Sequence, residues 1–121
     1  MKTIQSLFLA AALLAAGAPL AEAHAFLDHA DPKVGSQLHT APVSVRLWFT
    51  EELEPAFTTV QVLDAAGKEI DQKDAKVDPS DAKLLTVSLP ALQPGKYKVV
   101  WKAVATDTHI THGTFGFEFA P

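Results

Sequence analysis

The chain has 121 residues with 10 Lys and Arg against 14 Asp and Glu, a formal net charge of −4, and no cysteine. This acidic balance, with no visible basic patch, argues against a nucleic-acid or anionic-membrane ligand. The lack of cysteine excludes thiol redox chemistry, thiolate metal sites and a disulfide framework. Any metal ion must therefore bind through imidazole, carboxylate, amine or backbone groups.

Residues 1–23 have the layout of a secretory signal peptide. Lys2 precedes a short apolar run, and the small-x-small triplet AEA closes the segment, as at a signal peptidase site. The apolar run is too short for a membrane-spanning helix, which needs about 20 apolar residues. We therefore predict export, cleavage after Ala23, and a mature domain over residues 24–121 that begins with His24. An uncleaved membrane anchor is the alternative.

Alternation of apolar and polar residues predicts strands along most of the mature domain. The expected strands lie in residues 24–30, 43–49, 58–63, a short return after a turn at 65–67, then 83–90, 95–106 and 113–120. Residues 71–82 are charged and poor in apolar side chains, which predicts an exposed loop. About seven strands with short turns indicate an all-β fold, a sandwich or barrel of immunoglobulin-like type.

The same alternation predicts which side chains face the core. On the last two strands these are Tyr97, Val99, Trp101 and Ala103, followed by Phe115, Phe117 and Phe119. Trp48 and Trp101 stand at alternating strand positions, so we expect both to be packing residues.

Polar chemistry concentrates at the mature N-terminus and in the segment TDTHITHG, residues 106–113. Asp107 and His109 are two apart, so in an extended segment their side chains project to the same side. Such a pair suits a metal site or an acid–base pair, although Asp in a turn often only bonds its own backbone. His24, once freed by cleavage, offers its α-amine and its Nδ1 to one metal in a chelate ring.

With the imidazole of His109, His24 would complete a T-shaped set of three nitrogens, a histidine brace. Asp107 would add an anionic oxygen. Nitrogen and oxygen donors in a tetragonal set favour Cu(II). The alternative is that the cleavage site falls before a histidine by chance.

Three segments resemble the CopC family of periplasmic copper-binding proteins: HAFLDHADPKVGSQL, VSVRLWFTEELEP and PGKYKVVWKAVATDTHITHGTFGFEF. The resemblance covers about residues 24–119. Its most specific parts are the N-terminal His and the D-x-H before a Gly-x-Phe-x-Phe strand. It implies a small Greek-key β-barrel that works beside a CopD-like inner-membrane copper transporter.

The resemblance also implies the ligands of a single Cu(II) ion. These are His24, Asp107 and His109, with Glu51 as a weaker ligand or a hydrogen-bond acceptor near the metal. The alternative for Glu51 is a solvated charge at a strand end.

The chain departs from the family pattern in two places. Some members have a Met-rich loop that binds Cu(I), whereas the only methionine here is Met1, which is lost with the signal peptide. Ile110 and Thr111 stand where the family usually has proline and an apolar residue. His112, at a position that is normally not a ligand, could be a supplementary ligand, a base that contacts the ligands, or a surface residue.

We expect a monomeric periplasmic Cu(II) carrier or chaperone for copper homeostasis or resistance, not an enzyme and without a nucleic-acid partner. One alternative is a histidine-brace copper monooxygenase. Its axial tyrosine has no counterpart, because the only tyrosine, Tyr97, is expected to point inward well before Asp107. The other alternative is a metal-free immunoglobulin-like interaction module. His29 and His39 are expected to be exposed structural histidines.

Overall fold

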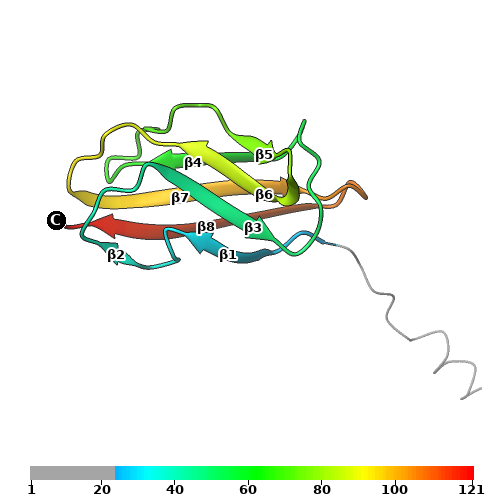
Figure 1. The fold of residues 1–121 in the computed structure, drawn as a ribbon, viewed down its shortest axis with the longest axis horizontal. Helices are drawn as coiled ribbons and strands as arrows, with labels where there is room; N and C mark the ends of the chain where they lie inside the picture. Colours follow the sequence, from blue (N-terminus) through cyan, green and yellow to red (C-terminus); the bar gives the residue numbers. More distant parts are fainter. Residues whose placement is uncertain (1–23) are drawn as a thin grey trace, which may run out of the picture.

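The computed structural model describes residues 24–121, and the predicted signal peptide at residues 1–23 lies outside the described part. The described chain forms two four-stranded sheets stacked as a β-sandwich (Figure 1). Its strands are β1 (Leu27–Asp31), β2 (Gln37–Leu38), β3 (Ser44–Phe49), β4 (Thr59–Leu63), β5 (Lys76–Asp78), β6 (Asp81–Ser88), β7 (Gly95–Val104) and β8 (Ile110–Phe119). Over residues 24–121, no helix has the length and apolar character needed to cross a membrane.

The two sheets have the strand orders β1-β3-β6-β5 and β2-β8-β7-β4. β7 and β8 form a long antiparallel hairpin, which pairs from Gly95 with Phe119 to Val104 with Ile110. β2 runs parallel to β8 at the edge of the same sheet. The all-β prediction is confirmed. Two strands, β2 and β5, were not expected from the sequence pattern. Both are very short and lie at sheet edges, and short edge strands are a common way to protect a sheet edge.

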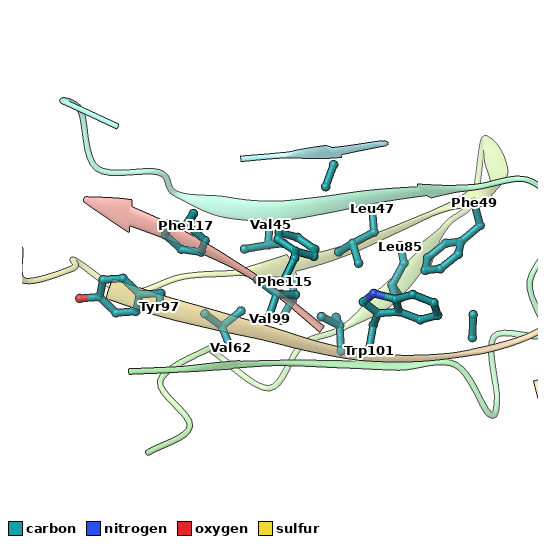
Figure 2. Packing of buried hydrophobic residues seen from close by; sticks show 14 of the residues in the cluster. Val45, Leu47, Phe49, Val62, Leu85, Tyr97, Val99, Trp101, Phe115 and Phe117 are labelled. Atoms are coloured by element: carbon teal, nitrogen blue, oxygen red, sulfur yellow. The ribbon is translucent and has the colours of Figure 1, made fainter. Parts of the chain in front are cut away.

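The core lies between the sheets, where the predicted alternation holds (Figure 2). Leu47 of β3 and Val99 of β7 are completely buried. Trp101 is 7% exposed and meets Phe49 edge to face, with ring centroids 5.1 Å apart. Tyr97 also points inward, as predicted. Each large apolar side chain buried in this way contributes about 1.5–3 kcal/mol, so the sandwich is a firm support for the loops at its ends.

The expectation of an exposed loop over residues 71–82 is only partly right: most of these residues are exposed, but not all of them form a loop. This stretch contains β5 and the start of β6, and Asp71 within it is only 8% exposed. One Asp71 oxygen accepts the N–H of Val62 at 2.8 Å, and the other accepts the N–H of Lys73 at 2.9 Å. Asp71 therefore has a structural role, because its buried carboxylate accepts hydrogen bonds from backbone N–H groups that have no partner in a sheet. Likewise, the short return strand expected after residues 65–67 is reduced to a single bridge between Leu63 and Glu69.

Trp48 is a packing residue, as predicted, and it lies on the outer face of its sheet. Its ring stacks on that of His29 with centroids 4.4 Å apart, and the Arg46 guanidinium lies 4.8 Å from the ring centroid. His29 is exposed, as predicted. His39 is exposed too, and its Nδ1 lies 2.9 Å from the carbonyl oxygen of Ala120. Each of the two histidines therefore makes a structural contact with another residue of the domain.

Candidate metal centre

The N-terminal residues and the loop between β7 and β8 meet at one end of the sandwich (Figure 1). There the imidazole of His24 lies beside that of His109, with ring centroids 4.5 Å apart and an interplanar angle of 31°. The ring of Phe26 stacks on that of His24, with centroids 5.9 Å apart. The fold thus brings together two histidines from opposite ends of the domain, as the brace hypothesis requires.

The β7–β8 loop is a tight turn that places His109 at the start of β8. The N–H of Thr108 donates to the carbonyl of Ala105 at 2.8 Å, and the N–H of Ala105 donates to the carbonyl of His109 at 3.0 Å. Thr108 has a φ of 76°, in the left-handed region that disfavours β-branched residues. The turn therefore holds some backbone strain directly beside the histidine, a pattern typical of functional loops.

Asp107 contacts His109 twice. Its Oδ1 accepts the backbone N–H of His109 at 3.2 Å, and its Oδ2 lies 3.0 Å from the ring Nδ1. The backbone N–H and the ring of His109 hold the pKa of the Asp107 carboxyl below its ordinary value. The predicted proximity of the two side chains is therefore observed, but a turn produces it and not the extended segment that we expected.

This contact decides which nitrogen of His109 is available to a metal. With the Nδ1–H donating to the Asp107 carboxylate, the lone pair lies on Nε2. A carboxylate in this position fixes the tautomer and the orientation of a metal-binding histidine. In the metal-free geometry Asp107 therefore orients the His109 ring, and it would have to turn away from Nδ1 to become a ligand itself.

Within residues 24–121 as they stand, no group of three or more His, Asp or Glu side chains is arranged to hold a metal ion. The structure joins His24 to His109 and Asp107 to His109 without directing all three side chains at one point. A histidine brace needs only two imidazoles, because its third nitrogen is a terminal amine. In the full-length chain that nitrogen belongs to the peptide bond between Ala23 and His24, so the third donor of a brace would exist only if the chain were cleaved there.

Glu51 lies at the same end of the sandwich, just beyond β3. Its neighbours place it there: Leu53 forms a bridge with Ala105, and the carbonyl of Glu52 accepts the N–H of Thr106 at 3.2 Å. The Glu51 side chain is half-buried. In the described chain no hydrogen bond or ion pair joins it to Asp107 or His109. Its suggested role as a weak ligand stays a prediction.

His112 is a strand residue and not part of the loop, because β8 begins at Ile110. It is exposed and pairs across the hairpin with Lys102. Successive side chains of a strand point to opposite faces. The neighbouring Thr111 contacts the N-terminal segment, so His112 faces the other side. Of the three roles considered for His112, the structure favours a surface residue.

Two threonines at this end were missed by the sequence reasoning. The hydroxyl of Thr111 donates to the carbonyl of Ala25, and the hydroxyl of Thr50 bonds both the N–H of Phe26 and the carbonyl of His24. The departure of Thr111 from the family pattern marked its position, but nothing in the sequence showed that either threonine contacts residues 24–26.

Comparison with known proteins identifies the class. A family model described as the CopC domain matches residues 27–120. Protein YobA of Escherichia coli (strain K12) is 35% identical over 118 residues, covering 95% of each chain. Copper resistance protein C of Pseudomonas syringae pv. tomato is 35% identical over 120 residues, covering 93% of this chain and 91% of the relative. Copper transport protein CutJ of Bacillus subtilis (strain 168) is 29% identical over 96 residues, which cover 78% of this chain but 18% of CutJ.

The fold agrees with the family model. The crystal structure of CopC from Methylosinus trichosporium OB3b matches with a TM-score of 0.76 and 32% identity, covering 81% of this chain and 95% of that one. The chain is therefore an all-β protein of the type seen in that structure. It belongs to the CopC family.

Proposed function

We propose that residues 24–121 form a periplasmic carrier that binds one Cu(II) ion where His24 meets His109. The observation that carries this proposal is the 4.5 Å separation of the two imidazole rings. Cleavage after Ala23 would add the α-amine of His24 to the two rings and complete the brace. Among divalent first-row metals, Cu(II) binds most tightly to such nitrogen and oxygen donors and suits a tetragonal arrangement.

The relatives support copper as the cargo, since two of them are named for copper resistance and copper transport. The match to CutJ covers only 18% of that protein, so a domain like this chain forms part of a larger copper transport protein. We propose that this chain, a monomer, delivers copper to a CopD-like transporter in the inner membrane.

The composition favours Cu(II) over Cu(I). The chain's only methionine is Met1 and it has no cysteine, so residues 24–121 offer no thioether or thiolate. Cu(I) prefers such soft sulfur ligands, whereas imidazole and amine nitrogens suit Cu(II). We therefore propose a single cupric site without a companion cuprous site.

A titration with Cu(II) tests the proposal directly. The protein that begins with His24 should bind one equivalent of Cu(II) with a Kd below about 1 μM. Protons compete with the metal for the amine and both rings, because these nitrogens bind a metal only when they are deprotonated. Affinity should therefore fall steadily as the pH drops below 7. Isothermal titration calorimetry at several pH values measures both, and no binding near neutral pH would refute the carrier.

The alternative of a histidine-brace copper monooxygenase has its own readout. A carrier that keeps copper as Cu(II) should produce little hydrogen peroxide when ascorbate and oxygen are added to the loaded protein. Sustained peroxide formation, above that of the same protein with His109→Ala, would support a redox enzyme instead.

Replacing Asp107 tests its contact with His109. Asp107→Asn removes the charge that orients the ring through Nδ1, so Cu(II) affinity should fall roughly 10- to 100-fold, as for other residues that support metal ligands. Asp28→Asn is the matched control, because Asp28 contacts the ring of the neighbouring His29 at 2.6 Å in the same way but lies outside the proposed donor set. Equal affinity in the two variants would mean that Asp107 neither orients nor ligates.

A further inference from the structure

We propose that the hydroxyls of Thr50 and Thr111 hold residues 24–26 against the sandwich and so position His24 beside His109. This positioning role rests on the proposed function, because it concerns the terminal residue of the copper site. We call residues 24–26 the N-terminal segment. It precedes β1, so it lies outside the regular strand ladder that begins at Leu27.

Thr50 attaches the N-terminal segment to one sheet. It directly follows Phe49, the last residue of β3. Its hydroxyl accepts the N–H of Phe26 at 3.0 Å and donates to the carbonyl of His24 at 3.3 Å, which uses the hydroxyl as both acceptor and donor. The backbone N–H of Thr50 also donates to the carbonyl of Phe26 at 2.9 Å. Thr50 thus contacts the peptide groups on both sides of Ala25.

Thr111 attaches the same segment to the other sheet. It is the second residue of β8, and its hydroxyl donates to the carbonyl of Ala25. The Ala25 side chain between these contacts is completely buried. The carbonyls of His24 and Ala25 are therefore each held by a threonine hydroxyl, one from each sheet. Because the two contacts come from different sheets, they hold the N-terminal segment in one direction and limit its rotation about its own axis.

Such anchoring matters because chain termini are poorly ordered unless they are tied down. In the cleaved protein only Ala25 and Phe26 separate the metal-binding residue from β1. Holding these residues in place before copper arrives reduces the ordering cost of binding. Valine at position 111 would have nearly the shape of threonine but would leave the buried Ala25 carbonyl without its donor.

The test compares Thr50→Val and Thr111→Val in the protein that begins with His24. A neutral hydrogen bond of this kind corresponds to about a two- to tenfold change in an equilibrium constant, so each variant should bind Cu(II) about two- to tenfold more weakly. In the metal-free state, the amide hydrogen of Phe26 should exchange faster in both variants. The Cu(II) electron paramagnetic resonance spectrum should broaden, because the His24 nitrogens no longer occupy one position.

Two further variants separate positioning from general destabilisation. Thr111→Ser keeps the hydroxyl and should restore affinity, exchange protection and the sharp spectrum. Thr114→Val makes the same substitution at an exposed site on the same strand and should change none of these readouts. Thermal unfolding of each metal-free variant shows whether the fold itself is affected.

The outcomes distinguish this inference from the proposed function. Suppose that the protein that begins with His24, without substitutions, binds Cu(II), and that both valine variants match it in affinity and in exchange of the Phe26 amide. The positioning role is then wrong, and the proposal of a copper carrier is unaffected. If the unmodified protein does not bind Cu(II), the carrier is wrong and the positioning role falls with it.

Discussion

A single alanine added before His24 should weaken Cu(II) binding by at least about 100-fold, a loss of about 2.7 kcal/mol. The added residue turns the α-amine of His24 into a peptide nitrogen, which binds a metal only after losing a proton that amides hold very strongly. The chelate ring of the brace is lost, and of its three nitrogens only the imidazoles of His24 and His109 remain. Competition titration of the two forms against a chromophoric Cu(II) chelator measures the difference.

The matched control carries the added alanine after Pro121, at the other terminus. It should bind Cu(II) like the protein that begins with His24. Mass spectrometry of the exported product should also find His24 as its first residue. Equal affinity in the N-terminally extended form would show that the amine is not a ligand, and the copper site would then have to be sought elsewhere on the domain.

The strands of the core could be predicted because burial on one face leaves a period of two in the sequence. β3, β7 from Tyr97 to Ala103, and β8 from Phe115 to Phe119 carry this period, and the structure confirms their inward residues. β5 could not be found in this way. It is a three-residue edge strand in a charged stretch, and its pairing with β6 depends on backbone hydrogen bonds, which leave no pattern in the side chains.

The candidate site was predictable only in part, for a similar reason. His24 and His109 are recognisable by residue type and, for His24, by its place directly after the predicted cleavage site, and the fold does bring them together. The turn that directs Asp107 onto the His109 ring depends on the left-handed Thr108, a conformation that threonine rarely adopts. The anchoring contacts of Thr50 and Thr111 join segments far apart in the chain, and no local pattern records such a pairing.

The second large effect should come from Gly113, which lies opposite Trp101 in the β7–β8 hairpin. A Cβ at position 113 would lie 2.2 Å from Cζ2 of Trp101 and 2.5 Å from its Cε2. The indole cannot move aside freely, because it is buried and packed against Phe49. Gly113→Ala should therefore destabilise the fold by about 3 kcal/mol, at the upper end of the usual cost of overpacking a core. Urea unfolding followed by tryptophan fluorescence measures this change.

Gly116→Ala is the matched control on the same strand. A Cβ there meets only the carbonyl oxygen of Tyr97, at 3.4 Å, so we expect a loss below about 1 kcal/mol. Trp101→Leu should make Gly113→Ala much less harmful, because residues in direct contact have non-additive effects. If both glycine variants lose the same stability, or if Gly113→Ala is equally destabilising in the Trp101→Leu background, a steric clash with the indole is not the cause. The hairpin that carries His109 would then owe its stability to other contacts.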